Sequence, residues 1–397
     1  MNPTKIRSMT AWLLTVAICL AAPAASADAV TDWNIQAGQI VTKVITGTPP
    51  ANRAMALVQT TVYYAVTHLD PGASAEAAIA AANRDALTAL VPAQKEAIAK
   101  AYDAALAAIP DGPGKNSGVA AGEKAATAVF AARANDSAMG AESYRPYTTA
   151  GNYVPTTLPV ALLWPQRKPW LMTSPSQFRP GPPPALTSET WVRDFNEVKP
   201  LGARNGSTRT EEQTAIAHFW EVTLPPVYHG VVRSVANQPG RDIVRNARLF
   251  ATVTQAADDA TIAVFDAKYA YGFWRPITAI RNADMDGNDA TTRDAGWLPL
   301  IDTPMHPEYP CAHCILAATI ATVLMNEVGQ GPMPVLTTTS DTPGAPTRSW
   351  TTAEDLIREV SLARIYDGVH YRNSTEVGTA MGRKIGALAA KGPALPP

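Results

Sequence analysis

The sequence has few cysteines, few charges and no excess of either charge. Only three of its 397 residues are cysteine, which excludes a disulfide-rich scaffold. The 33 basic and 34 acidic residues nearly cancel, so the chain lacks the basic surplus of nucleic-acid-binding proteins and of polybasic membrane-surface proteins. Hydrophobic residues make up 46% of the chain, which is enough for a core and excludes disorder as the main state.

The N-terminus has the pattern of a secretory signal peptide. A short basic segment precedes the apolar run 11–22, and residues 25–27 form an A-x-A cleavage pattern. The apolar run is shorter than the roughly 20 residues that a membrane span needs. We therefore expect residues 1–27 to be removed, a mature chain that begins at Asp28, and a periplasmic or secreted location. No later segment reaches spanning length, so we expect no integral membrane segment in the mature chain.

The rest of the sequence predicts an all-α protein, with strand-like alternation scarce throughout. Nine prolines fall between Pro155 and Pro184, a density that excludes a helix or a central strand and indicates an ordered wrap over a helical body. We expect a single helical domain over 28–397, with N-terminal helices and the Pro-rich wrap in 28–200 and the catalytic part in 201–397. Helical spacing predicts helices over Arg53–Thr67, Ala75–Leu90, Ala93–Ile109, Val119–Ala132 and Ile243–Asp266, and a capping box at Thr210 and Gln213.

A first motif places two cations in an aromatic, apolar stretch. Lys268 and Arg275 are seven residues apart, which on one helix puts them on the same face roughly 10 Å apart. Pro276 is expected to end or bend that helix. Because buried cations require anions, this motif indicates either a binding site or structural ion pairs.

A second motif opens an almost wholly apolar run that predicts a buried helix. Pro310, Cys311, Ala312 and His313 form its start, where free N–H groups and a partial positive charge favour an oxyanion. A third motif places Arg364 six residues before His370, with Asp367-Gly368 between them permitting a break in the helix. Together the three motifs supply three cations and two histidines, a set that suits a tetrahedral oxyanion such as phosphate or vanadate.

The three motifs resemble the signature of the type 2 phosphatidic-acid phosphatase and vanadium haloperoxidase superfamily. That signature reads K-x6-RP, then PSGH, then SR-x5-H-x3-D, and the sequence around Lys268 looks more like the soluble haloperoxidase branch. The matching residues are Lys268, Arg275 and Pro276 in the first block, Pro310 and His313 in the second, and Arg364 and His370 in the third.

The resemblance implies an all-α helical bundle of the haloperoxidase and acid phosphatase type, and a role for each motif residue. His370 would coordinate the vanadium of bound vanadate, or attack phosphorus in a phosphatase, and His313 would be the acid or base. The oxyanion-binding residues would be Lys268, Arg275, Cys311, Ala312 and Arg364. The expected reaction is vanadate-dependent oxidation of halide by hydrogen peroxide. The alternative is hydrolysis of phosphate monoesters through a phosphohistidine, without a cofactor.

The chain departs from the signature at four places. Cys311 replaces a serine and is a weak hydrogen-bond donor, and Ala312 replaces a glycine. The serine that should precede Arg364 is absent. Ser374 stands where an aspartate would orient His370.

Other interpretations remain open on the sequence alone. Cys311 and Cys314 form a C-x-x-C at a helix start, which in a βαβ context would indicate a thiol-redox enzyme, and which otherwise is a buried thiol pair or a disulfide. With His313 they lack a fourth ligand for zinc, and the acidic turn 284–289 departs from a calcium loop. His306 is close enough to the second motif to line its pocket. A non-catalytic anion-binding protein also stays possible.

Overall fold

The computed structural model describes residues 28–136 and 144–396, so the signal peptide predicted for 1–27 lies outside the described residues. The N-terminal part forms five helices: α1 (Ala29–Thr42), α2 (Thr48–Thr67), α3 (Ala75–Leu90), α4 (Lys95–Ala107) and α5 (Pro113–Ala132). The remaining helices are α6 (Glu189–Leu201), α7 (Glu211–Phe219), α8 (Pro225–Ala236), α9 (Ile243–Tyr271), α10 (Pro276–Arg281), α11 (Ala312–Val328), α12 (Ala353–Tyr366) and α13 (Arg372–Leu388). Short 3-10 turns occupy Pro92–Gln94, Trp164–Gln166, Ala283–Met285 and Ala389–Lys391.

The predicted all-α architecture is confirmed, and strands are minor in the described part of the chain. The short strands β1 (Leu336–Thr338) and β2 (Arg348–Trp350) form an antiparallel ribbon, with Leu336 opposite Trp350. The predicted capping box is present, since Thr210 and Gln213 cap each other's backbone at the start of α7. Two helices begin earlier than expected, because α2 and α5 both take proline into their first turn, where its missing N–H has no cost.

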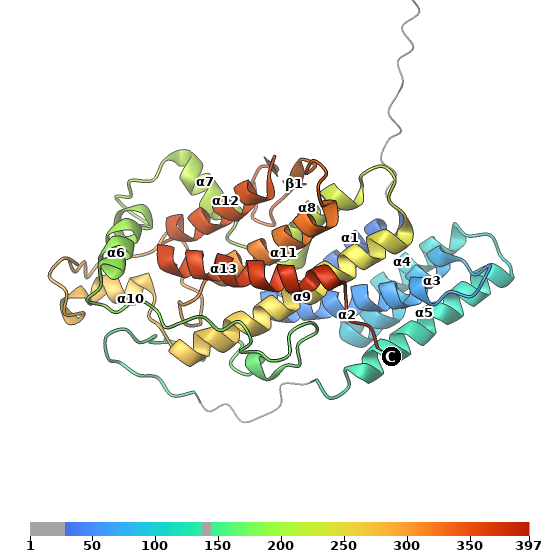
Figure 1. The fold of residues 1–397 in the computed structure, drawn as a ribbon, viewed down its shortest axis with the longest axis horizontal. Coiled ribbons are helices and arrows are strands. Elements are labelled where there is room, and N and C mark those ends of the chain that lie inside the picture. The colour runs from blue at the N-terminus through green and yellow to red at the C-terminus, as the bar shows by residue number, and fades with distance from the viewer. Residues whose placement is uncertain (1–27, 137–143, 397) are drawn as a thin grey trace, which may run out of the picture.

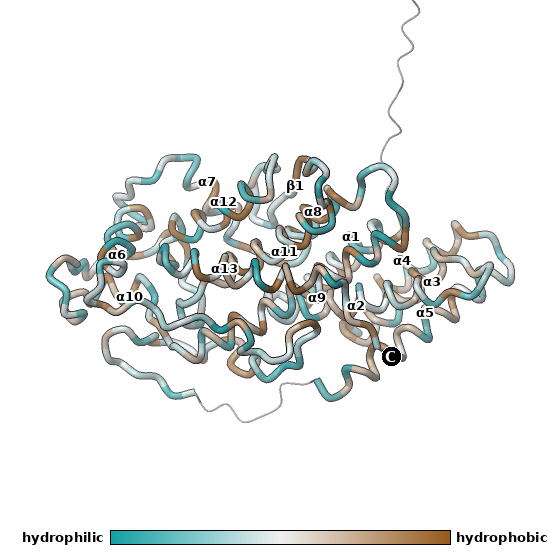
Figure 2. Tube along the Cα trace, in the orientation of Figure 1, coloured by the Kyte–Doolittle hydropathy of each residue, from teal (hydrophilic) through white to brown (hydrophobic). Residues whose placement is uncertain are grey.

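The long helix α9 forms the axis of the molecule. It runs diagonally through the fold in Figure 1, with α2 and α11 packed along it and α13 packed on α11. The main apolar core contains residues from both the N-terminal helices and the C-terminal ones. Along the helices, brown and teal segments alternate in Figure 2. No helix of the described residues is long and apolar enough to cross a membrane.

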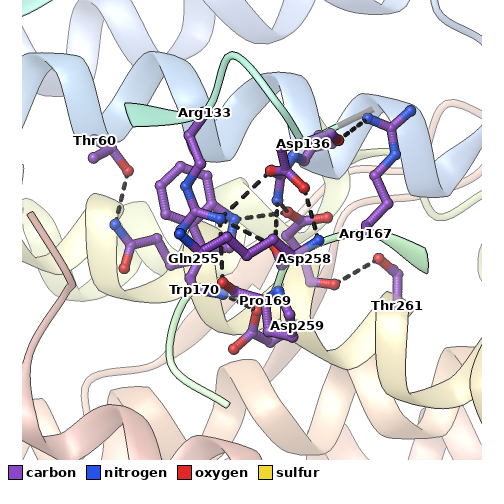
Figure 3. Close-up of polar contacts among 12 residues, drawn as sticks. Thr60, Arg133, Asp136, Arg167, Pro169, Trp170, Gln255, Asp258, Asp259 and Thr261 are labelled. Atoms are coloured by element: carbon purple, nitrogen blue, oxygen red, sulfur yellow. Dashed lines mark hydrogen bonds and ion pairs between the residues drawn. The ribbon is translucent and has the colours of Figure 1, made fainter. Parts of the chain in front are cut away.

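The Pro-rich segment between α5 and α6 wraps over α9, as predicted, and is fastened there by Asp259. This buried carboxylate accepts hydrogen bonds from three consecutive backbone amides, at 2.7 Å from Trp170, 2.8 Å from Leu171 and 2.9 Å from Met172. The indole of Trp170 donates to Asp258, the neighbouring residue of α9, at 2.7 Å. Figure 3 shows Trp170 beside Asp258 and Asp259.

Arginines from α2 and α5 complete this fastening. Arg53 pairs with Asp258 and with Asp136, and Arg133 pairs with Asp136 and stacks over the ring of Trp170. The whole set is called the anchor cluster below and consists of Arg53, Arg133, Asp136, Arg167, Trp170, Asp258 and Asp259. It holds the wrap against α2, α5 and α9, the last of which carries Lys268.

Candidate functional site

Lys268 lies in the last turn of α9 and is fully buried. The helix ends three residues later, where Gly272 takes the left-handed conformation at φ 58° that a side chain would disfavour. The ammonium group donates to the backbone oxygens of Pro307 at 2.9 Å and of Glu308 at 2.8 Å. Burial, together with the charge of Arg275, lowers the pKa of Lys268 well below its usual value. One of its three N–H donors is left over.

Arg275 is not on the same helix as Lys268, contrary to the sequence-based expectation. Gly272 ends α9, and Arg275 is the N-cap of α10, whose first residue is Pro276. The buried guanidinium donates to the backbone oxygens of His306 at 3.0 Å and of Val369 at 2.8 Å. It also contacts the ring nitrogens of His306 at 3.0 Å and of His370 at 3.2 Å. The turn therefore brings the first motif to the third, which helical spacing alone did not predict.

The second motif forms the N-terminus of α11, as predicted. Cys311 is the N-cap and is joined to Cys314 in a disulfide, and its sulfur accepts the backbone N–H of Cys314. Because that sulfur carries no hydrogen, it cannot supply the hydrogen bond that a serine would give to an oxyanion. The backbone N–H groups of Ala312 and His313 make no hydrogen bond within the described residues, and both point from a helix start.

The third motif is broken between its two functional residues, as predicted. Helix α12 ends at Tyr366, and Gly368 follows at φ 76°, packed so closely that a Cβ there would lie 2.4 Å from the backbone oxygen of Gly202. This turn directs both Arg364 and His370 into the interior, where each is about 1% exposed. Arg364 pairs with Asp367 at 2.5 Å and donates to the backbone oxygen of Trp220 at 3.3 Å, while its buried Nε has no partner in the described structure.

Two buried carboxylates at the site were not predicted from the sequence. Glu308 lies 2.7 Å from Nδ1 of His370 and also accepts the backbone N–H of Tyr371 at 3.1 Å. Burial raises the pKa of Glu308 to about 7 and that of Asp367 to about 7. The only signal for Glu308 in the sequence is a single charge between two prolines, because its partner is 62 residues away.

The motif residues surround one cavity of about 460 Å³. His306, His313, Arg364 and His370 line it, together with the N-terminal residue of α11, Ala312. Its other walls are mostly apolar and include Pro50, Val160, Trp164, Phe265 and Leu316. Lys268, Arg275 and Cys311 are not among the residues that line this cavity.

Burial and neighbouring cations act together on the two histidines. Burial, with a further contribution from the neighbouring cations, lowers the pKa of His313 and of His370 well below the usual value. Each ring is therefore neutral near pH 7. Nε2 of His313 is 3.2 Å from the hydroxyl of Thr223, a further residue that the motifs did not reveal. The site cluster named below consists of Lys268, Arg275, Glu308, His313, Arg364, Asp367 and His370. The structure thus brings the five predicted side chains together, and their catalytic roles stay predictions.

The part of the chain that carries this site is similar to known proteins. Residues 248–392, which contain all three motifs, match the family described as "VCPO second helical-bundle domain". The vanadium chloroperoxidase of Curvularia inaequalis is 28% identical over 144 residues, which cover 30% of this chain and 23% of that protein. Both similarities lie in the C-terminal part of the chain or cover less than a third of it, and the matched family domain contains Lys268, Arg275, His313, Arg364 and His370.

Solved structures of the superfamily share the fold over nearly the whole chain. A bacterial vanadium-dependent iodoperoxidase superposes with a TM-score of 0.74 at 22% identity, covering 91% of this chain and 95% of that one. A bacterial vanadium-dependent chloroperoxidase in its holo form gives a TM-score of 0.71 at 17% identity, covering 93% of this chain and 94% of that one. The chain spans about a quarter of the length of the curated relative.

Proposed function

We propose that this protein is a vanadate-dependent haloperoxidase that binds a tetrahedral oxyanion at the inner end of the cavity. The observation that supports the proposal is a surplus of buried positive charge. Within the described residues, Lys268 and Arg275 form no ion pair with any carboxylate and bond only to carbonyl oxygens and histidines. Buried cations without anions are unfavourable, so a bound anion would complete the cluster.

The donors that are left over fit vanadate. Nε of Arg364 is buried and unpaired, Lys268 has a spare N–H, and the first amides of α11 are free. These groups would hold the vanadate oxygens, and Nε2 of His370 would be the ligand of the metal. Bound vanadate would supply the Lewis acidity that activates hydrogen peroxide toward attack by a halide ion.

The side chains of the protein would bind and move protons around that group. His313 is neutral because of burial and nearby cations, so it is ready to accept a proton from hydrogen peroxide. The hydroxyl of Thr223 holds its Nε2 at the cavity wall. The buried cations would neutralise the oxyanion, and the apolar walls would keep bulk water from the reacting atoms.

Phosphate monoester hydrolysis is the second candidate, and one contact favours it. The carboxylate of Glu308 beside Nδ1 makes His370 more basic at Nε2, as a nucleophile requires. In this reaction Nε2 would form a bond to phosphorus while the ester oxygen leaves with a proton, which His313 must first have gained. Water would then hydrolyse the phosphohistidine. Both reactions use the same anion site.

One purified sample, assayed in two ways, tests the proposal. Halide oxidation is followed with vanadate and hydrogen peroxide, and phosphomonoester hydrolysis is followed with and without vanadate as an inhibitor. We expect vanadate-dependent halide oxidation, and we expect His370→Ala to abolish it while the thermal unfolding curve stays close to that of the wild type. No activity in either assay, combined with no vanadate binding, would refute the enzyme proposal.

We also propose that the protein is exported to the periplasm or secreted, because its first 27 residues have the signal-peptide pattern. Its partners would be small molecules, namely halide and peroxide or a phosphate ester. N-terminal sequencing of the protein from its native host tests this proposal, with Asp28 the expected first residue.

A further inference from the structure

We propose that Glu308 is the positioning residue for His370 and replaces, from the loop before α11, the carboxylate that the superfamily motif places at position 374. The inference rests on the proposed function of His370. Ser374 lies at the motif position, and its neutral hydroxyl is 3.4 Å from Nδ1 of His370. Glu308 reaches the same nitrogen at 2.7 Å. The carboxylate is therefore retained in space although it has moved 66 residues along the sequence.

Contacts at both ring nitrogens of His370 require the same tautomer. Arg275 has only N–H donors, so Nε2, which lies 3.2 Å from its Nη1, must present a lone pair. The proton of the neutral ring is then on Nδ1, where the Glu308 carboxylate accepts it. This is the tautomer that a ligand or nucleophile at Nε2 needs, and a carboxylate on the opposite nitrogen raises its basicity.

The cations of the site hold Glu308 in place. Lys268 donates to the backbone oxygen of Glu308 and to that of the preceding residue, at 2.8 and 2.9 Å. Arg275 fastens the backbone of His306 two residues earlier. The other oxygen of Glu308 has no partner within the described residues, and the side chain is fully buried. The carboxylate is not in contact with solvent, and its hydrogen-bond partners are His370 and the backbone N–H of Tyr371.

Ser374 adds to this arrangement without replacing it. Burial raises the pKa of Glu308, and the nearby Ser374 side chain acts against that rise. A serine at this position thus supports the carboxylate, whereas an aspartate there could bond to Nδ1 directly. A carboxylate at position 308 or at position 374 could accept the proton on Nδ1 of His370. The carboxylate can therefore be moved from one position to the other as an experiment.

The experiment compares the wild type with Glu308→Gln, Glu308→Ala and the double variant Glu308→Ala/Ser374→Asp. Vanadate affinity is measured by titration, turnover is measured in the proposed assays, and the His370 tautomer is read by NMR of ¹⁵N-labelled histidine. We expect Glu308→Ala to weaken vanadate binding roughly 10- to 100-fold and to lose the Nδ1–H tautomer. The isosteric Glu308→Gln should show a smaller loss of affinity. The double variant should regain at least about tenfold of the affinity lost in Glu308→Ala, together with the tautomer.

Glu327→Gln is the matched control, because Glu327 is a largely buried carboxylate that pairs with Arg241 and Arg245, away from the cavity. It should leave affinity and tautomer unchanged. Wild-type affinity and tautomer in both Glu308 variants, or an aspartate at 374 that restores neither property, would overturn the inference. If the wild type binds no vanadate and has no activity, the proposed function fails, and the NMR result alone then decides whether Glu308 positions His370.

Discussion

The molecule contains two ionic clusters that each include residues of α9, and they differ in how their charges are paired. In the anchor cluster, three arginines accompany three aspartates, and Arg53 and Arg133 contact carboxylates directly. In the site cluster, three cations accompany two carboxylates, and only Arg364 of the three pairs with one in the described structure. Lys268 and Arg275 bond to carbonyl oxygens and histidines instead.

This difference separates a structural cluster from a binding cluster. The anchor cluster joins α2, α5 and the Pro-rich wrap to α9, and its charges are balanced by the protein itself. His313, Arg364 and His370 of the site cluster line a cavity, and in the proposed function an anion that enters this cavity balances the cations. Buried arginines therefore occur in both clusters, and the clusters differ in whether the charged groups contact carboxylates or carbonyl oxygens and histidines.

Replacing one arginine in each cluster is expected to give the largest effects, on stability in the anchor cluster and on vanadate affinity in the site cluster. Arg53→Met removes the cation that pairs with both Asp136 and Asp258. It leaves Asp258 buried without an ion pair and Asp136 with Arg133 alone, which should lower the free energy of unfolding by about 3–5 kcal/mol. Arg364→Met removes charge-assisted hydrogen bonds to the oxyanion and should weaken vanadate binding roughly 100-fold. Urea unfolding and vanadate titration of both variants measure the two effects.

Arg364→Met/Asp367→Asn is the control, since it removes the partner carboxylate along with the cation. Its stability should recover relative to Arg364→Met while its vanadate affinity stays low. The distinction between the clusters would be wrong if Arg53→Met weakened vanadate binding as much as Arg364→Met did in protein that is still folded.

A change of pH is expected to alter the anion affinity of the site cluster, by less than the arginine replacements do. Burial raises the pKa values of Glu308 and Asp367 to about 7, so both carboxyls are largely protonated below this value and the cluster is more positive there. An anion binds better to the more positive form. Affinity for sulfate, whose own charge does not change in this range, should therefore fall as pH rises through 7, by up to about tenfold per pH unit.

Calorimetric titration of sulfate between pH 5.5 and 8.5 measures this dependence. Glu308→Gln removes one of the two titrating groups and should flatten the curve. Sulfate affinity that does not fall between these pH values would show that these carboxyls do not change their charge in the range and would remove the basis of the prediction.

The sequence predicted those parts of the structure that depend on local chemistry. Helical periodicity located several helices, among them α2, α3, α4, α5 and α9, but not α6, α8, α12 or α13. Proline density located the wrap, and Asp367-Gly368 located the break that turns Arg364 and His370 inward. These features are encoded within a few neighbouring residues. The start of α11 at Ala312 belongs to the same class, because a helix start after proline is a local pattern.

The contacts that were missed join residues far apart in the chain. No spacing rule connects Glu308 to His370 or Thr223 to His313, because each contact exists only after α9, α11 and α13 have packed. The shared helix predicted for Lys268 and Arg275 was wrong for a local reason. Gly272, in the left-handed conformation, ends α9 between them, and a glycine there was an available signal.

Removing the disulfide at the start of α11 is expected to change vanadate affinity and stability least. This removal tests whether the buried cations of the site cluster are enough to bind the anion. Cys311→Ser/Cys314→Ala removes a cross-link over a very short loop, whose entropic contribution is about 2 kcal/mol, and a serine N-cap would offset part of that loss. A serine hydroxyl can accept the backbone N–H at the N-cap and donate its hydrogen to an oxyanion. Vanadate affinity should therefore stay the same or rise a few-fold.

Cys314→Ala alone distinguishes the thiol from the missing cross-link, because it leaves Cys311 as a free thiol beside the proposed peroxide site. This variant should lose activity progressively in excess peroxide as the thiol is oxidised, while the double variant and the wild type should not. A tenfold loss of vanadate affinity in the double variant would contradict the prediction. It would mean that the disulfide, and not the surplus of buried cations, shapes the anion site.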